Sequence, residues 1–292
     1  MREIALHSPS PLPLSHQGRG SILDLLRGHH IIRKEKIMNV KDCIAVVTGG
    51  ASGLGEATVR NLASGGGRVT IFDIQADRGE ALAKELGDNV IFANTDITSE
   101  ESVQAGIKKT VDTFGGINVA VNCAGVGAAQ KILGKKGPMS LDHFNKVLQI
   151  NLVGTVNVIR LAVEQMVNNT PNEEGERGVI VNTGSAAATD GQIGQPAYSA
   201  SKAGVNGMTL PIARECAEYG IRVCTINPGI FETPMLATLP ENVRDALGKM
   251  VPFPKRLGRP SEYAKLVQHI IENTMLNGEV IRLDGAIRMQ PK

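Results

Sequence analysis

The sequence is poor in aromatic side chains. It contains no tryptophan, and only 3% of its 292 residues are phenylalanine, tyrosine or tryptophan. Proteins that bind single-stranded nucleic acid need aromatic platforms on which bases stack, so this class is disfavoured. The formal net charge of +2 is also small, whereas a dedicated nucleic-acid surface usually forms a strongly basic stripe. We therefore expect no specific nucleic-acid partner.

Cysteine, histidine and long apolar runs are scarce as well. The cysteines show neither the paired spacing of a metal site nor a disulfide framework, which predicts reduced thiols and a cytoplasmic protein. Their positions are Cys43, Cys123, Cys216 and Cys224. Outside the first 37 residues, the histidines His143 and His269 are isolated, so we expect no bound metal. No uninterrupted apolar run approaches the roughly 18 residues of a membrane span, and we expect no membrane contact.

The first 37 residues differ in composition from the rest of the chain. They are basic, poor in acids and interrupted by Pro9, Pro11 and Pro13. Three interpretations compete: a translation artefact upstream of Met38, a disordered extension, and a transit peptide that would direct the protein to the mitochondrial matrix. The first two are favoured because a strong amphipathic basic helix is missing.

From Ile44 onwards, short apolar runs alternate with amphipathic stretches of helical spacing. The runs are Ile44–Val47, Val69–Phe72, Val90–Phe92, Val119–Val121, Val179–Val181, Ile221–Ile226 and Glu279–Leu283. The helical stretches are Gly55–Ala63, Arg78–Leu86, Ser99–Phe114, Ser140–Val167, Ala197–Tyr219 and Ser261–Asn273. Continuously apolar, β-branched strands are typical of a sheet that is covered on both faces.

This alternation predicts an α/β fold of right-handed βαβ units. We expect residues 38–292 to form a single domain of Rossmann type, a doubly wound parallel sheet of about seven strands with helices on both faces. Pro211 falls inside a helical pattern and is predicted to kink or end that helix. The proline-rich segment near 233–256 is predicted to leave the sheet and form a lid.

A glycine-rich loop, Thr48–Gly55, follows the first apolar run and precedes a helical stretch. Its glycines permit a tight turn, a close approach of a pyrophosphate and close packing of helix on strand, while the helix N-terminus supplies amide donors. A glycine cluster alone is often only a tight turn, but this position favours a dinucleotide site. No Lys-Ser or Lys-Thr pair follows the last glycine, which excludes a P-loop. The expected cofactor contacts are Gly49, Ser52, Gly53, Leu54 and Gly55.

Asp73 ends the second apolar run, at the distance from the glycine loop where an acidic side chain can accept hydrogen bonds from ribose hydroxyls. A carboxylate there would repel a 2′-phosphate, and Ala51 and Ser52 offer no cation to neutralise one. An acid at a strand end is common in itself, but the loop upstream favours a cofactor role. The pattern predicts NAD rather than NADP.

Tyr198 and Lys202 lie four residues apart, on one face of a predicted helix. A phenol with a pKa of about 10 is a poor base at neutral pH, so we expect the ammonium, together with the positive charge of NAD⁺, to lower the pKa of Tyr198. Ser185 follows the run Val179–Val181 and would hold the same substrate oxygen. Each feature alone is more often packing, a solvated charge or a cap. Beside a dinucleotide loop, they predict hydride transfer between a secondary alcohol and a nicotinamide.

Together these motifs resemble the short-chain dehydrogenase/reductase family over Lys41 to Met289. The resemblance implies a homotetramer in which Ser185, Tyr198 and Lys202 are catalytic and Asn151 supports a proton relay to the lysine. It also implies cofactor contacts by Tyr198 and Lys202 and by a further set: Asp96, Ile97, Asn122, Cys123, Gly125, Pro228, Phe231 and Thr233. Cys123 replaces the second Asn of the family's Asn-Asn-Ala-Gly motif, and we expect it not to act as a reactive thiol.

Within the family, segments such as Gly191–Gln195 and the C-terminal Asn277–Met289 are similar to the type II 3-hydroxyacyl-CoA dehydrogenase subgroup. This resemblance implies an acyl-CoA substrate of short or branched chain, with Gln192 and Gln195 beside it. The lysines of Lys131–Pro138 would either meet the CoA phosphates or form a solvated charge cluster. Two alternatives stay open: a secondary alcohol or hydroxysteroid dehydrogenase acting on ketones, and a scaffold subunit of an RNA-processing complex.

Overall fold

The computed structural model describes residues 38–237 and 240–291. The interpretations of residues 1–37 fall outside these residues. Within them, a seven-stranded sheet has the order β3-β2-β1-β4-β7-β8-β9, and each neighbouring pair is parallel. The strands are β1 (Ile44–Thr48), β2 (Arg68–Asp73), β3 (Val90–Asn94), β4 (Val119–Asn122), β7 (Gly178–Thr183), β8 (Ile221–Pro228) and β9 (Val280–Leu283). The predicted doubly wound parallel sheet is confirmed.

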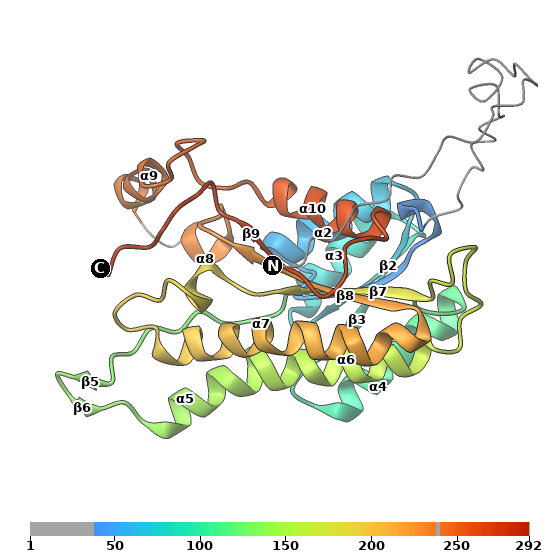
Figure 1. Cartoon of the computed structure of the whole chain (residues 1–292), viewed down its shortest axis with the longest axis horizontal. Helices are drawn as coiled ribbons and strands as arrows, with labels where there is room; N and C mark the ends of the chain where they lie inside the picture. The colour runs from blue at the N-terminus through green and yellow to red at the C-terminus, as the bar shows by residue number, and fades with distance from the viewer. Residues whose placement is uncertain (1–37, 238–239, 292) are drawn as a thin grey trace, which may run out of the picture. The chain divides into compact units, whose positions relative to one another are not determined.

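Both faces of the sheet are covered because consecutive side chains of each strand are apolar. Val46 and Val47 point to opposite faces, and both are fully buried. Val47 packs with α2 (Gly53–Ser64), α3 (Ala76–Leu86) and α10 (Pro260–Glu272). Val46 packs on the other side, together with α4 (Glu100–Phe114), α6 (Gly154–Met166) and α7 (Pro196–Cys216). Figure 1 shows these two helical layers above and below the strands.

The strand order reverses direction at β1, which has β2 on one side and β4 on the other. The loops after these two strands therefore diverge to opposite faces and leave a crevice at their carboxyl ends, where ligands bind in open α/β sheets. All predicted site segments follow carboxyl ends of strands or lie near them. The fold thus brings them to one edge.

One long helix lies across the sheet on the α7 side. It consists of α5 (Leu141–Leu148), a π-helical turn, η2 (Gln149–Val153), and α6. By length and composition Leu141–Met166 could cross a membrane, and 50% of its most apolar 18-residue window is buried inside the domain. The sequence predicted this helix as Ser140–Val167 but not its overall apolar character, because polar residues interrupt the apolar ones.

The helix α7 does not end at Pro211, contrary to the stronger form of our prediction. A proline ring inside a helix collides with the carbonyl four residues earlier and removes one hydrogen bond. That earlier residue is Gly207, which is exposed and has no atom within 4 Å of a Cβ built on it. Water can therefore reach the freed carbonyl, and the helix continues to Cys216.

Three short elements extend beyond the sheet. A hairpin of β5 (Leu133–Gly134) and β6 (Gly137–Pro138) precedes α5. The chain also leaves the sheet after β8 through α8 (Pro234–Ala237) and α9 (Glu241–Lys249) before it returns as α10. This is the excursion that the prolines predicted; its role as a lid stays a prediction.

A buried ion pair holds the end of α10 against β8. The Arg222 guanidinium lies 2.7 Å from the Glu176 carboxylate, and their side chains are 8% and 6% exposed. Arg222 also donates to four backbone carbonyls, those of Ile270, Ile271, Asn273 and Leu276. Burial raises the pKa of Glu176, and the charge of Arg222 opposes that shift. The arginine therefore satisfies both a buried acid and the carboxyl end of a helix.

We expect Arg222→Met to lower the free energy of unfolding by about 3–5 kcal/mol, because it leaves a buried carboxylate without its partner. The matched control is Arg160→Met, whose pair with Glu100 has side chains 46% and 52% exposed; it should cost at most about 1 kcal/mol. Urea unfolding followed by circular dichroism measures both losses. Equal losses in the two variants would show that the buried pair contributes no more to stability than the exposed pair does.

Candidate active site

A cavity of about 1050 Å³ lies along the carboxyl edge of the sheet. It brings together most of the residues that the sequence predicted for the cofactor, the chemistry and the substrate. Those that line it are Gly49, Ser52, Gly53, Leu54, Gly55, Asp73, Asp96, Ile97, Cys123, Gly125, Ser185, Gln192, Gln195, Tyr198, Lys202, Pro228, Phe231 and Thr233. Asn122 and Asn151 are not among its lining residues.

The glycine loop has the backbone that a dinucleotide site needs. Gly49 and Gly53 have φ angles of +62° and +56°, a region that side chains disfavour. A side chain on Gly55 would collide with the carbonyl oxygen of Gly49, so only glycine lets α2 start this close to β1. Ser52 is the N-cap of α2, and its side chain makes no capping hydrogen bond. The first-turn amides are therefore left for an anionic ligand.

Asp73 lies at the end of β2 and is only 6% exposed. One carboxylate oxygen accepts from the backbone N–H of Ala51, and the other accepts from that of Gln75, each at 3.0 Å. The carboxylate therefore fixes the glycine loop relative to β2 and still lines the cavity. These residues fit the adenosine end of a dinucleotide.

Asp96 and Asn122, two further predicted cofactor contacts, lie in different surroundings. Asp96 is exposed, and its Oδ1 accepts from the backbone N–H and hydroxyl of Thr98, at 2.9 and 2.7 Å. Asn122 is 3% exposed, and its amide donates to Asn182 Oδ1 on the neighbouring strand at 2.9 Å. The Asn122 side chain is thus buried within the sheet, and a contact of this residue with the cofactor stays a prediction.

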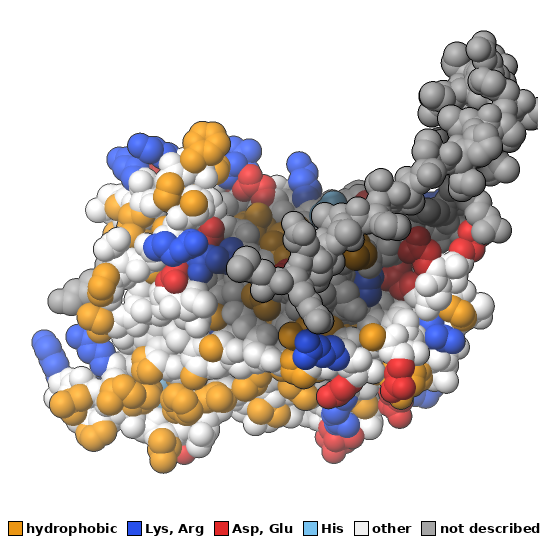
Figure 2. Space-filling model, viewed as in Figure 1, with side chains coloured by type: hydrophobic (Ala, Val, Ile, Leu, Met, Phe, Trp, Pro, Cys, Tyr) orange, Lys and Arg blue, Asp and Glu red, His pale blue; other side chains and the backbone are white. Residues whose placement is uncertain are grey.

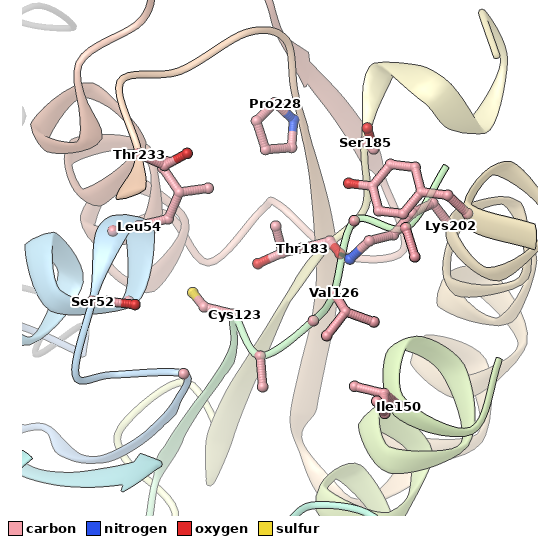
Figure 3. A pocket seen from close by; sticks show the side chains of 18 of the residues that line it. Ser52, Leu54, Cys123, Val126, Ile150, Thr183, Ser185, Lys202, Pro228 and Thr233 are labelled. Carbon is pink, nitrogen blue, oxygen red and sulfur yellow. Dashed lines mark hydrogen bonds between the residues drawn. The ribbon is translucent and has the colours of Figure 1, made fainter. Parts of the chain in front are cut away.

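Lys202 is buried beside the cavity, with 5% of its surface exposed. Its ammonium donates to the backbone carbonyl of Thr183 at 2.7 Å and lies 5.9 Å from the centre of the Tyr198 ring. Ser185 follows Thr183 closely in the chain, and its backbone N–H donates to Asn227 Oδ1 at 2.9 Å. In Figure 3 the Lys202 amine points from α7 towards Thr183, with Ser185 nearby.

The protein surroundings of Tyr198 raise its pKa, and the lowering expected from Lys202 together with NAD⁺ stays a prediction. Burial raises this pKa, and the hydrogen bond with Ser185 lowers it by less. Lys202 bonds to Thr183 rather than to the phenol, and burial lowers the pKa of Lys202 from 10.5 to about 8. Desolvation therefore opposes charge on both groups, and the phenol stays protonated at neutral pH in the unliganded chain.

Asn151 lies in the π-helical turn and is fully buried. Its amide oxygen accepts from the Val126 N–H at 2.8 Å, while its amide nitrogen donates to the Val126 carbonyl and to Ser201 Oγ, at 3.0 and 3.1 Å. The side chain thus holds the cavity-lining segment at Val126 against α7. Asn151 thus positions this part of the site, and its support of a proton relay to Lys202 stays a prediction.

Cys123 belongs to a partly buried network of hydrogen bonds. Its thiol donates to Tyr263 Oη at 3.6 Å, and that oxygen lies 2.7 Å from Thr183 Oγ1. Burial raises the pKa of Cys123, as expected for a thiol that is not reactive. Thr183 and Tyr263 were not predicted from the sequence. Thr183 could have been found from its place at the end of β7, two residues before Ser185.

The cavity also has an apolar wall that the sequence did not reveal. It is formed by Ile230 after β8, Leu236 of α8, Leu247 of α9 and Met289 near the chain end. Met289 is distant in sequence from the other three, and no local pattern links the four residues. The wall suits a hydrocarbon group of a substrate.

Known proteins are similar to this chain in sequence and in fold. A family model described as short chain dehydrogenase matches residues 43–244. The 3-hydroxyacyl-CoA dehydrogenase type-2 of Drosophila melanogaster is 57% identical over 254 residues, which cover 86% of this chain and 100% of that protein. Its Homo sapiens namesake is 56% identical over 255 residues, covering 87% and 98%. The crystal structure of 3-hydroxyacyl-CoA dehydrogenase type-2 from Mycobacterium avium matches with a TM-score of 0.81 and 45% identity, covering 85% of this chain and 96% of that one.

We expect Lys202→Met to raise the free energy of unfolding at pH 7 by about 2 kcal/mol. The lowered pKa of Lys202 destabilises the folded wild type by on the order of 3 kcal/mol, and the variant is free of this penalty. The hydrogen bond to Thr183 that the variant loses reduces the gain by about 1 kcal/mol. The same variant should lose activity. In the unfolded chain the lysine keeps its ordinary pKa, so between about pH 8 and 10.5 the folded wild type binds fewer protons and gains stability. The advantage of the variant is therefore full below pH 8 and shrinks above it.

Thermal unfolding at pH 7, 8 and 9.5 measures this difference. Lys108→Met is the matched control, since Lys108 pairs with Asp112 on the surface and is 74% exposed; it should change stability little at any of these pH values. A Lys202→Met protein less stable than wild type at pH 7 would contradict the claim that the ammonium is held at a cost.

Proposed function

The chain belongs to the short-chain dehydrogenase family, and from that premise we propose that it transfers a hydride between a 3-hydroxyacyl-CoA of short or branched chain and NAD, with Tyr198 as general acid and base. Family membership makes it an oxidoreductase. The observation that carries the proposal is the group Ser185, Tyr198 and Lys202 in the same cavity as a dinucleotide loop. This complete set favours an enzyme over a scaffold protein.

The geometry assigns a task to each group. Tyr198 exchanges the proton of the substrate oxygen, and Ser185 holds the same oxygen by a hydrogen bond. Lys202 supplies a positive charge near the phenol, which stabilises the phenolate when the proton leaves. A bound nicotinamide would supply or accept the hydride. Because burial favours the protonated form of Tyr198, the site is prepared to donate a proton to a ketone.

Asp73 supports NAD as the cofactor. Its carboxylate lines the cavity, and the loop residues Ala51 and Ser52 beside it carry no positive charge. The 2′-phosphate of NADP would therefore meet the buried negative charge of Asp73 with no cation of the loop beside it. The ribose hydroxyls of NAD would instead donate to that carboxylate.

Asp73→Asn tests this choice, because it removes the charge and keeps an acceptor for the Ala51 N–H. We expect the ratio of kcat/KM with NAD to that with NADP to fall roughly tenfold or more, the size of one charge-assisted hydrogen bond. Asp77→Asn is the matched control, since Asp77 is an exposed acid at the start of α3. An unchanged ratio in Asp73→Asn would remove the role assigned to this carboxylate.

An acyl-CoA substrate would meet lysines on one side of the cavity and the apolar wall on the other. The relatives compared above bear the name 3-hydroxyacyl-CoA dehydrogenase type-2. In this chain Lys135 and Lys136 form the exposed turn of the β5–β6 hairpin, and Lys131 precedes it. The hairpin follows the segment Val126–Ala129, which lines the cavity. Lysines there can meet phosphates, while the apolar wall takes the acyl chain.

We expect NADH-dependent reduction of acetoacetyl-CoA to have a kcat/KM at least roughly tenfold above that of ethyl acetoacetate, a keto ester without the CoA group, or of a 17-ketosteroid. Tyr198→Phe should lower kcat on every substrate about 10²–10⁴-fold while NADH still binds, as measured by fluorescence. A thioester no better than the free ketones would favour the alternative, a secondary alcohol or hydroxysteroid dehydrogenase.

A double substitution tests the lysines within the same assay. Lys135→Ala with Lys136→Ala should raise KM for acetoacetyl-CoA roughly threefold to tenfold, the effect of losing one or two exposed phosphate contacts, and leave ethyl acetoacetate unaffected. The matched control is Lys84→Ala with Lys109→Ala, two exposed lysines that do not line the cavity. Equal KM values in both double variants would mean that the hairpin lysines only solvate the surface.

We further propose that the chain forms a homotetramer. An exposed apolar row supports this, because monomers rarely leave such surfaces in water. It runs along the long helix and α7 and consists of Leu141, Val153, Val156 and Leu210, which are 75%, 46%, 38% and 43% exposed. Figure 2 shows apolar side chains gathered over these helices.

A further inference from the structure

The chain end makes a sharp turn after β9. Gly285 and Ala286 have φ angles of +60° and +66°, and Ala286 is the one non-glycine residue with positive φ among the described residues. The Asp284 carboxylate accepts from the Ala286 N–H at 2.9 Å, which stabilises this unfavourable backbone. Residues 284–291, which we term the C-terminal strap, are thereby directed back across the cavity end of the domain.

The strap pairs with the loop of residues 186–195, which we term the substrate loop. The Ile193 N–H donates to the Pro291 carbonyl at 3.0 Å. The side-chain amide of Gln192 donates to the Gln290 carbonyl at 2.9 Å. Gln192 also lines the cavity, so the strap holds a residue that was expected to face the substrate.

Arg282, at the end of β9, fastens the two segments together. Its guanidinium donates to Thr189 Oγ1 and to Asp190 Oδ2, both at 2.7 Å. It also donates to Asp284 Oδ2 at 2.7 Å and to the Ile287 carbonyl at 3.1 Å. One partly buried cation thus bonds both the substrate loop and the strap, although Arg282 does not itself line the cavity.

On its other side the strap enters the apolar wall. Ile287 is 1% exposed and packs with Ile230, Val251 and Leu257. Met289 packs against the same cluster and lines the cavity. Figure 1 shows the chain end near α8 and α9, at the end of the domain where the β5–β6 hairpin also lies.

We propose that the C-terminal strap sets the length of acyl chain that the cavity accepts, with Met289 as the end wall and Arg282 as the residue that positions the strap. This inference rests on the proposed function. The proposed function places the CoA phosphates by the lysines of the β5–β6 hairpin, on one side of the cavity. The acyl chain then extends towards the apolar wall, where each added methylene approaches Met289. The side chain of Met289 is flexible and unbranched, so it fills such a space and its position tolerates substitution.

The test compares 3-oxoacyl-CoA substrates of four and eight carbons with NADH, using the full chain. Met289→Ala should raise the ratio of kcat/KM for eight carbons to that for four carbons at least fivefold, and Met289→Phe should lower it at least threefold. Arg282→Met should raise the ratio in the same direction, because a loosened strap withdraws the wall. Met275→Ala, at a methionine 92% exposed and outside the cavity lining, should leave the ratio unchanged.

Free methyl ketones of matched length are measured in parallel. Wild-type protein that is inactive on every thioester but active on ketones would sink the proposed function, and the ketone ratios would then decide on the strap. Ratios that stay at the wild-type value in both Met289 variants would overturn the strap inference while the acyl-CoA activity stands. A change in Met289→Ala without one in Arg282→Met would retain the wall and reject the positioning role.

Discussion

Parallel strands can be joined only by crossovers that return to the same edge of the sheet, and this constraint places every functional segment. Seven strands in register bring the ends of β1, β2, β4, β7 and β8 to one side. The glycine loop, Asp73, Cys123 and Ser185 lie at or just after these ends. Residues as far apart in sequence as Gly49 and Thr233 thus share one cavity.

Within that cavity, two titratable side chains are buried at a cost to the stability of the fold. Lys202 and Tyr198 are both largely removed from water, and burial disfavours the charged form of each. The lysine keeps a single carbonyl partner, Thr183, which in turn is bonded through its side chain to Tyr263. Such a site is poorly satisfied until a ligand brings complementary charge and hydrogen bonds. Strained or unsatisfied groups of this kind persist where the surrounding fold determines their positions.

The sequence predicted what depends on local pattern. Continuous apolar runs revealed strands because both faces of the sheet are buried, and spacing alone put Tyr198 and Lys202 on one helical face. It did not predict what depends on partners distant in sequence. The pKa of Tyr198 rises because of desolvation, which no spacing reveals, and Asn151 is occupied by Val126 and Ser201. Met289 reaches the cavity only through the turn after β9. Pro211 is tolerated because an exposed glycine lies one turn before it.

The π-helical turn has a consequence for how this chain can change. In η2 the Gly154 N–H donates to the Gln149 carbonyl, five residues earlier, so the long helix holds one residue more than regular α-helical winding would. The extra residue is absorbed within the turn, so α5 and α6 keep nearly the phase of an uninterrupted helix. Removing one residue there would restore regular winding without turning α5 away from α7 or α6 away from the sheet. What would change is the position of Asn151 and its contacts with Val126 and Ser201, so the π-helical turn serves the site rather than the packing of the helix.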